Sequence, residues 1–448
     1  MLITHARVAT LGETPRLIED GAVWIRDGLI EAVGTTRALT ADHPRAEIWD
    51  AQGQLLMPAN LCGHTHTYGA FARGWSYPGP PAARFSEILA RLWWRLDKAL
   101  TPEDIRASAR VYLADAIRHG TTTLIDHHAS PNAIAGSLDL IAEAVKTAGV
   151  RAALCYEVTD RDGPARMQAG IDENVRFLTR LRHDPDPQLG ASFGLHASLT
   201  LSPATLARVV DAAAGLETGF HLHAAEGIED VEDSLAKYGT RVIHRLHDAG
   251  ILGERTIVAH AVHVDDAEID VLAETGTWVT HQPRSNMNNA VGFAPVGRML
   301  DRGVRVALGN DGFSNNMVAE MKAAYLGHKL VQRDPRAMPA DRVFALAYAA
   351  NAELSRIFWP DLRLGEIASG AVADLILVDY KPTTPLTAAN LPWHMIFGYE
   401  ASAITATVSA GRVLMRDRRL LTLDEEAVIA RARSLARDLW ARAEEVAV

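Results

Sequence analysis

Two histidines separated by one residue, His64 and His66, follow an apolar run that predicts a buried strand. Side chains two positions apart on a strand point to the same face, so the two imidazoles would converge on one point. Converging imidazoles are a common way for a protein to bind a divalent metal such as zinc. The chain contains 18 histidines, however, so one such pair arises easily by chance. The rest of the chain must decide whether this pair binds a metal.

Side chains that could bind a metal recur where three further predicted strands end. One strand ends in His223, with Glu226 three positions later, another carries His260, and Asp311 follows a third. Each alone favours a structural role, because a lone histidine on an apolar strand usually belongs to the core and Asp-Gly usually forms a turn. Those structural roles do not explain why all of these residues fall at strand ends. Their joint placement therefore predicts one shared site.

Such a site needs a framework that brings distant strand ends together. From residue 55 the sequence alternates strand, loop and helix in roughly eight units over about 300 residues, which is typical of a (β/α)8 TIM barrel. In that fold the chemistry lies at the carboxyl ends of the strands. A doubly wound sheet gives the same alternation, usually with fewer units. The predicted strands span residues 55–62, 121–126, 151–158, 189–196, 219–223, 256–263, 277–281 and 305–309.

Strand patterns also flank this region at both ends of the chain. Residues 21–34 predict a hairpin around an Arg-Asp-Gly turn, and strand patterns return after residue 364. We expect an α/β protein of three parts. They are a small β-sandwich domain built from residues 1–57 and 364–420, a TIM barrel over residues 58–363, and a C-terminal helix within residues 421–448 that packs on the body.

Composition limits the possible functions. The hydrophobic content of 48% and charged content of 22% are ordinary for a globular protein, and the formal net charge of -10 argues against a nucleic-acid or membrane partner. The sequence has no signal-peptide pattern and no apolar run long enough to span a membrane, so we expect a cytoplasmic protein. Its two cysteines, Cys62 and Cys155, exclude a disulfide scaffold or a Cys-rich zinc site and are expected to be buried.

The pattern H-x-H, H-x-x-E, His and D-G at four strand ends resembles the amidohydrolase superfamily. The resemblance covers nearly the whole chain and is closest to the mononuclear branch of cytosine, guanine and 8-oxoguanine deaminases and triazine hydrolases. Within that branch, residues 92–97, 126–131 and 284–289 look most like aminohydrolases of the SsnA type. The motif set is specific for the superfamily and much less specific for a substrate.

The resemblance implies one divalent metal ion per chain, zinc in the first place and iron as the alternative. It assigns this ion to four ligands: His64, His66, His223 and Asp311. His221 lies one layer deeper on its strand and is expected to be structural. The residue before Asp311 is Asn310, where threonine is commoner, and this difference could alter the contacts around the ligand without removing it.

The resemblance also implies roles for three catalytic residues. Asp311 would take a proton from the attacking water, and His260 would hold the hydroxide and assist that transfer. Glu226 would protonate the ring nitrogen beside the attacked carbon. His263 is expected to be a peripheral neighbour of His260.

Four further residues are candidate substrate contacts at the same end of the barrel: His196, His128, Trp94 and Arg73. His196 matches a loop that contacts substrate in relatives, and His128 follows the second barrel strand. Either Trp94 or its neighbour Trp93 would stack on a planar ring or join a subunit interface, while the other faces the core. Arg73 would either neutralise an anionic substrate group or form a surface ion pair. Asn288 replaces the usual lysine of its loop, which puts a substrate contact from that loop in doubt.

The resemblance implies a hydrolytic deaminase that acts on a small molecule. Such an enzyme releases ammonia from an amidine-like carbon of a purine, pterin or triazine-like ring through a metal-bound hydroxide. An alternative keeps the metal but expels chloride or an alkylamine, as the triazine hydrolases do. A non-catalytic scaffold on the same fold should have lost ligands, whereas every expected position is filled here. A nucleic-acid-editing deaminase is disfavoured because the H-x-E…P-C-x-x-C signature is absent. The resemblance also favours a homo-oligomer.

Overall fold

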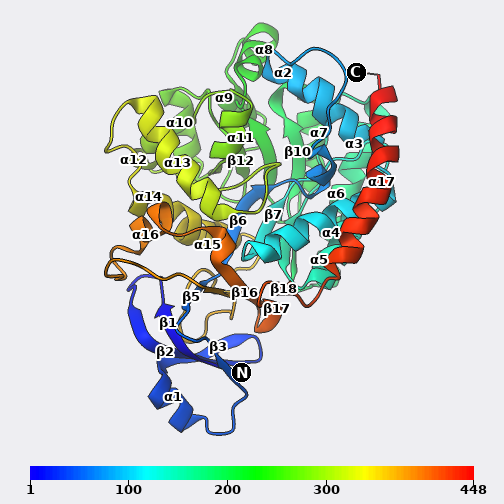
Figure 1. Ribbon diagram of the computed structural model, residues 1–448. Coiled ribbons are helices and arrows are strands. Elements are labelled where there is room, and N and C mark those ends of the chain that lie inside the picture. The colour runs from blue at the N-terminus through cyan, green and yellow to red at the C-terminus, as the bar shows by residue number, and fades with distance from the viewer. Residues whose placement is uncertain (448) are drawn as a thin grey trace.

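Strands from both ends of the chain pair in one nine-stranded mixed sheet, which lies below the main body in Figure 1. The computed structural model describes residues 1–447. Asp27 and Gly28 form the turn of the predicted hairpin with φ of 52° and 82°, the left-handed values that a type I′ turn needs. The N-terminal strands are β1 (Leu2–Ala9), β2 (Leu17–Arg26), β3 (Leu29–Thr35), β4 (Ile48–Asp50) and β5 (Leu55–Pro58), with α1 (Thr36–Asp42) between β3 and β4.

The C-terminal strands extend the same sheet from its β5 side. The order is β18-β17-β16-β15-β5-β1-β2-β3, and β4 pairs with β1. Apolar side chains from β1, β2, β5, β15 and β16 bury one another in a single cluster. The added strands are β15 (Leu375–Val378), β16 (Ile404–Ser409), β17 (Arg412–Arg416) and β18 (Arg419–Leu420).

Two parallel sheets form the main body. The four-stranded sheet contains β6 (Asn60–Thr65), β7 (Thr121–Asp126), β8 (Arg151–Leu154) and β9 (Leu189–Ala191) in that order. The five-stranded sheet contains β10 (Phe193–Ala197), β11 (Phe220–Ala224), β12 (Ile257–His260), β13 (Trp278–His281) and β14 (Arg305–Leu308). Isolated parallel bridges link the two sheets on both sides, between Thr65 and Asp311 and between Val158 and Leu195.

Two predicted strands are each divided in the structure. The apolar run 55–62 forms β5 and β6, which belong to different sheets, and the run 189–196 forms β9 and β10, which also belong to different sheets. The chain leaves the first sheet at Ala59, whose N–H donates to Asp374 O at 2.9 Å. An unbroken apolar run carries no periodic signal for such a change of sheet, so the sequence suggested single strands.

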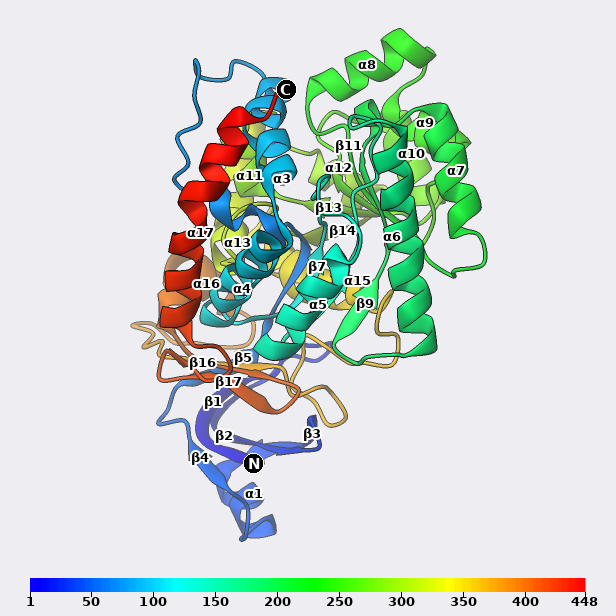
Figure 2. The ribbon, with the colours of Figure 1, turned by 90° about the vertical axis from the view of Figure 1, so that its right-hand side faces the viewer.

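Helices lie around the parallel sheets (Figures 1 and 2). The helix α4 (Pro102–Arg118) begins with a capping box between Thr101 and Asp104 and has proline at its first position, and both features favour a helix start at this point. The helices after β7 are α5 (Ser137–Ala148), α6 (Pro164–His183), α7 (Pro203–Ala213), α8 (Ile228–Tyr238), α9 (Val242–Asp248), α10 (Asp266–Glu274), α11 (Pro283–Asn288), α12 (Val296–Asp301), α13 (Met317–Gln332), α14 (Ala340–Ala345), α15 (Asn351–Ser355) and α16 (Leu391–Phe397).

A helical segment between β6 and β7 covers the carboxyl end of the sheets. It consists of α2 (Phe85–Ile88), a π-helical turn (Leu89–Trp93) and α3 (Trp94–Ala99), and α4 (Pro102–Arg118) follows it. The C-terminal helix α17 (Glu425–Glu445) packs on α3 and α4, as both ribbon views show. Its Trp440 Nε1 donates to Phe71 O at 2.8 Å.

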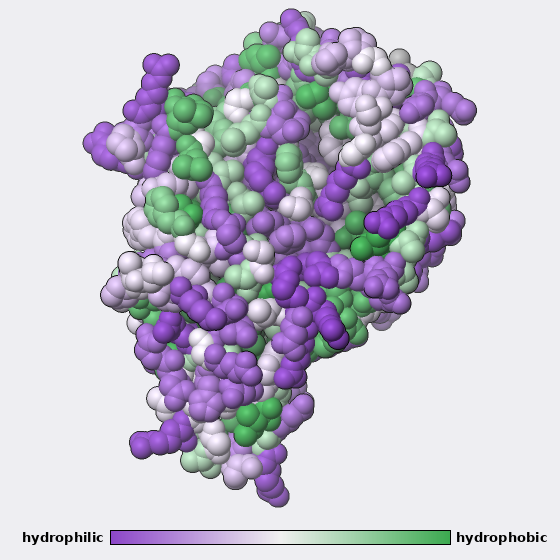
Figure 3. Space-filling model, in the orientation of Figure 1, coloured by the Kyte–Doolittle hydropathy of each residue, from purple (hydrophilic) through white to green (hydrophobic). Residues whose placement is uncertain are grey.

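Within residues 1–447, no helix combines the length and the apolar character needed to cross a membrane. The face seen in Figure 3 is mostly hydrophilic, with apolar side chains in small groups. Both cysteines are buried and free, as expected from the sequence.

Candidate active site

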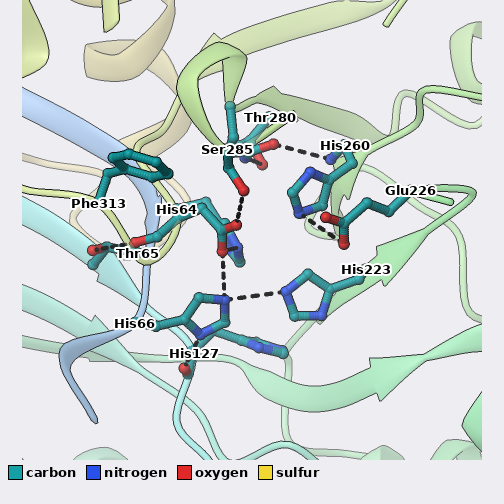
Figure 4. Close-up of polar contacts among 12 residues, drawn as sticks. His64, Thr65, His66, His127, His223, Glu226, His260, Thr280, Ser285 and Phe313 are labelled. Carbon is teal, nitrogen blue, oxygen red and sulfur yellow. Dashed lines mark hydrogen bonds and ion pairs between the residues drawn. The ribbon is translucent and has the colours of Figure 1, made fainter. Parts of the chain in front are cut away.

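Side chains from four strand ends meet at the carboxyl edge of the parallel sheets (Figure 4). His64 lies in β6 and His66 just after it, His223 lies in β11, His260 ends β12, and Asp311 follows β14. His260 and Asp311 adopt φ of 74° and 56°, in a region that non-glycine residues rarely enter. Backbone strain of this kind is typical of functional sites.

The candidate ligand atoms lie close enough to share one ion. His66 Nε2 is 2.8 Å from Asp311 Oδ1 and 3.2 Å from His223 Nε2, and His64 Nε2 is 3.5 Å from Asp311 Oδ1. Four atoms around one zinc ion at its usual bond lengths are separated by about 3.4 Å. The buried Nε2 atoms of His64 and His260 have no hydrogen-bond partner. These unpaired nitrogens and spacings are compatible with a metal ion here, although the group of four whose ligand atoms lie mutually close contains His260 in place of His66.

His260 also approaches this cluster. The ligand atoms of His64, His223, His260 and Asp311 all lie within 4.8 Å of one another. His260 therefore lies close enough to contact an ion bound at this cluster, in addition to its predicted role of holding the attacking water.

In each candidate ligand histidine, the Nδ1 atom contacts a polar atom on the side away from the cluster centre. Such contacts fix each ring so that its Nε2 faces the centre. The contacts are His64 Nδ1 to His221 Nε2 at 2.9 Å, His66 Nδ1 to His127 O at 2.6 Å, and His223 Nδ1 to His196 O at 2.8 Å. His221 thus lies behind the candidate ligand His64, a position compatible with the structural role expected for it.

Asp311 is an ionised carboxylate in this environment. Burial raises its pKa, but the close imidazoles of His64 and His66 outweigh burial and hold the pKa well below its ordinary value. Its Oδ2 accepts a hydrogen bond from Ser285 Oγ in α11. Asp311 can therefore accept a proton as well as bind a cation.

Glu226 and His260 face each other on the opposite side of the cluster. Glu226 Oε2 is 3.4 Å from His260 Nε2, and Asn289 Nδ2 donates to Glu226 Oε1 at 3.4 Å. Burial and the nearby Asp311 carboxylate raise the pKa of Glu226 well above its ordinary value, which favours the protonated form of its carboxyl group. Burial lowers the pKa of His260 to about 4 and keeps its ring neutral. Asn286 Nδ2 lies 2.9 Å from His260 Nδ1 and fixes the ring.

A small cavity of about 50 Å³ lies beside these groups. We expected only one of Trp93 and Trp94 to face the site, but both line the cavity. They lie at the end of the π-helical turn, a feature that often occurs at functional sites because it changes the directions of neighbouring side chains. His196 lines the cavity too, with its Nδ1 2.7 Å from Thr200 Oγ1.

The structure does not bring Arg73 and His128 to the cavity. Arg73 lies over the ring of Tyr112 and 3.9 Å from Asp115, because these residues of α4 face it with an aromatic ring and a negative charge. Of its two predicted roles, the structure therefore favours the ion pair. His128 is buried, and its Nε2 lies 2.9 Å from Ser130 Oγ, away from the cavity.

Glu157 is a cavity residue that the sequence analysis did not identify. Its carboxylate lies 2.9 Å from His127 Nδ1, 3.6 Å from His66 Nδ1 and 3.8 Å from His196 Nε2. Burial raises its pKa, but these histidines outweigh burial and hold the pKa well below its ordinary value. The available signal was an acidic residue within the apolar strand prediction 151–158, where a buried charge needs partners.

Comparisons with known proteins point to one family. A model of the amidohydrolase family matches residues 55–414. A 5-methylthioadenosine/S-adenosylhomocysteine deaminase from Syntrophobacter fumaroxidans is 33% identical over 445 residues, which are 98% of each chain. A 5′-deoxyadenosine deaminase from Methanosarcina mazei is 32% identical over 446 residues, 99% of each chain.

A solved structure extends the similarity to the fold. An adenosine deaminase from Xanthomonas campestris with bound zinc has a TM-score of 0.85 and 27% identity, over 99% of this chain and 98% of that one. The similarity therefore includes the whole region that carries the predicted site residues.

Proposed function

The chain belongs to the amidohydrolase family, and from this premise we propose that it is a metal-dependent aminohydrolase of a nitrogen heterocycle. It hydrolyses carbon–nitrogen bonds other than peptide bonds and releases ammonia from an amidine-like ring carbon. The observation that carries the proposal is the position of Glu226, a buried protonated acid 3.4 Å from His260 and beside the ligand cluster. Relatives named as deaminases of adenosine derivatives support the same reaction.

Three imidazoles and one carboxylate form a ligand set that suits zinc. His64, His66, His223 and Asp311 would hold the ion, and the zinc-containing adenosine deaminase supports this choice of metal over iron, which also accepts imidazole. When bound, the ion would lower the pKa of a water molecule toward about 7 and so supply a nucleophile at neutral pH.

Two carboxyl groups with opposite pKa shifts divide the proton transfers between them. Glu226 is protonated and can give its proton to the ring nitrogen beside the attacked carbon, which makes that carbon electrophilic. Asp311 is ionised and can accept a proton from the attacking water. That proton can then pass to the amino group, which leaves as ammonia. His260 is neutral and can hold the attacking oxygen by a hydrogen bond.

Metal analysis followed by an ammonia-release screen over purines, pterins and triazines tests the proposal. We expect about one metal ion per chain and ammonia from at least one ring class. Release of chloride or an alkylamine instead would favour the triazine-hydrolase alternative. A fully loaded protein that releases none of these products would favour the scaffold interpretation.

The proposal extends to the division of the chain. Residues 58–363 form a closed (β/α)8 barrel, residues 1–57 and 364–420 a small β-sandwich, and residues 421–448 a helical extension. The bridges between Thr65 and Asp311 and between Val158 and Leu195 support closure, because they join both sides of the parallel sheets. The shared apolar cluster of the nine-stranded sheet supports the sandwich.

A cytoplasmic location and a homo-oligomer complete the proposal. Two free buried cysteines are typical of proteins from reducing compartments. Helices α13 and α16 leave Leu326, Leu330 and Phe397 exposed by 61%, 77% and 69%, an apolar surface of the kind that another copy of the chain would cover.

A further inference from the structure

A second cavity lies between α4 and α17, which pack along each other in both ribbon views (Figures 1 and 2). Its volume of about 430 Å³ is within the range of roughly 300–1,000 Å³ that is typical of ligand pockets. None of its lining residues lines the cavity beside Glu226. We call it the α4–α17 groove, after the residues between Glu103 and Arg110 and between Asp424 and Arg431 that form its two sides.

The two sides of the groove bring three arginines to one place. On each side, four lining residues follow the i, i+3, i+4 and i+7 spacing of one helix face. They are Glu103, Arg106, Ala107 and Arg110 on α4, and Asp424, Ala427, Val428 and Arg431 at the start of α17. Three of these eight side chains are positive and two are acidic, in a chain whose formal net charge is -10. The groove is therefore a local concentration of positive charge on an acidic protein.

Arg110 forms no ion pair with an acidic residue of the described chain, residues 1–447. Its Nε is buried and has no hydrogen-bond partner. Arg106 instead lies 3.3 Å from Glu143, and Arg431 pairs with Glu103. A guanidinium stays charged in proteins, and burying part of a charge is costly unless an opposite charge accompanies it. The groove thus contains a cation that still lacks its anion.

The two acidic lining residues do not supply that anion. Glu103 binds Arg431. The Asp424 side chain accepts a hydrogen bond from Ala427 N at 3.0 Å, as the N-cap of α17. Because both carboxylates are already engaged, the N–H groups of Arg110 are left for a ligand.

We propose that the α4–α17 groove binds a small organic anion, at a site separate from the one at Glu226. The phosphate or carboxylate group of the ligand lies against the guanidinium of Arg110, with Arg106 as a second cation one helical turn away. Its carbon skeleton contacts Leu423 and Val428, which line the same groove. Arg106 can leave Glu143 for the ligand, because their ion pair has exposed fractions of 35% and 53% and such pairs contribute little. The proposal does not rest on the proposed function.

Calorimetric titration of the metal-loaded protein with phenyl phosphate, benzoate, inorganic phosphate and phenol tests this site. We expect at least one of the two phenyl anions to bind and uncharged phenol not to bind. Tighter binding of phenyl phosphate than of benzoate would assign a phosphate ligand, and the reverse order a carboxylate. Inorganic phosphate should bind more weakly than phenyl phosphate, because it has no apolar part. The proposal is overturned if neither phenyl anion binds, or if phenol binds as tightly as they do.

Arg110→Gln separates the groove from a bound metal ion, which also attracts anions. This change should raise the Kd of the tighter phenyl anion at least about 10-fold, because it removes a charge-assisted hydrogen bond. Arg437→Gln is the matched control and should leave the Kd unchanged, since Arg437 is exposed on the same helix and does not line the groove. Equal affinity in the native protein and Arg110→Gln would place the anion elsewhere and overturn the proposal.

Ala427→Trp tests the groove without a change of charge. Ala427 is exposed and lines the groove, so an indole at this position occupies the space of the ligand. The Kd of the same phenyl anion should again rise at least about 10-fold. Ala430→Trp is the control, because Ala430 is exposed on α17 outside the groove. Metal content should stay at the native level in both variants, and unchanged affinity in folded Ala427→Trp would contradict the proposal.

Discussion

Glu226 Oε2 lies 3.4 Å from His260 Nε2, and burial moves the pKa values of the two groups in opposite directions. The pKa of the carboxyl rises well above its ordinary value, and that of the imidazole falls to about 4. These opposite shifts favour a protonated acid beside a neutral ring over an ion pair. A proton held on Glu226 is available for transfer to a substrate nitrogen.

The role of Glu226 can be separated from metal binding by mutation. Glu226→Gln keeps the size of the side chain but removes the transferable proton, so kcat should fall by roughly 10²–10⁴-fold. The metal content should stay at the native level, because Glu226 is not among the four ligand residues. Steady-state ammonia release and elemental analysis on the same preparation check both quantities.

His66→Ala serves as the contrasting variant. It removes a nitrogen that lies 2.8 Å from Asp311 Oδ1 and 3.2 Å from His223 Nε2, so metal content and activity should fall together. Near-normal turnover by Glu226→Gln, with metal content unchanged, would contradict the acid role of Glu226.

Removal of the metal should lower the stability of the protein. The ligand side chains are buried, and in the unfolded chain they are far apart in sequence, so the ion binds the folded state preferentially. Free zinc at 100 times its dissociation constant would stabilise the fold by about 2.7 kcal/mol. Scanning calorimetry should show a lower Tm after chelation and recovery on addition of zinc. Asp311→Asn is the control, and it should lose most of the zinc-dependent shift.

The ion pair between Asp97 and Arg161 should be costly to break. Both side chains are buried, with exposed fractions of 2% and 8%, so Arg161→Met would leave the Asp97 carboxylate without its cation. The expected loss is about 3–5 kcal/mol in the free energy of unfolding, measured by urea denaturation. The double variant Asp97→Asn with Arg161→Met should recover part of this loss. If Arg161→Met is as stable as the native protein, Arg161 is not needed to compensate a buried negative charge on Asp97.

The sequence could predict which candidate ligands lie together because strand periodicity and position at a strand end constrain them. His64 and His66 share a face through their spacing, and His223 and Asp311 lie at ends of strands that belong to the same sheet. Parallel strand ends meet at one edge, so residues far apart in the chain could be placed together without a structure.

The remaining parts of the site depend on directions that spacing does not determine. Ser285 and Asn289 reach the cluster from α11 and the residue after it, and their orientation follows from how that helix packs. Arg73 and His128 belong to the loops from which substrate contacts were predicted, but their side chains contact other residues. Arg73 approaches Asp115, and His128 approaches Ser130. Sequence alone indicates which loop a residue occupies, but not what its side chain contacts.

The buried histidines outside the site should make the protein sensitive to mild acid. His328 packs against His281 and Phe293, with ring centres 5.1 and 4.8 Å away, and burial lowers its pKa to about 4, with a smaller contribution from Lys329. In the unfolded chain a histidine has a pKa of about 6.5. Between these two values the unfolded state binds more protons, so stability is present above pH 6.5 and falls as the pH drops toward 4. One such group contributes about 2 kcal/mol of loss between pH 6.5 and pH 5.

Urea denaturation at pH 7 and pH 5 measures this loss. His328→Gln removes the titrating group, so its free energy of unfolding should change less between the two pH values than that of the native protein, by about 2 kcal/mol. His183→Gln is the matched control, because His183 is exposed at the end of α6 and should leave the native pH dependence unchanged. An equal pH dependence in native protein and His328→Gln would mean that His328 is protonated to the same extent in the folded and unfolded states.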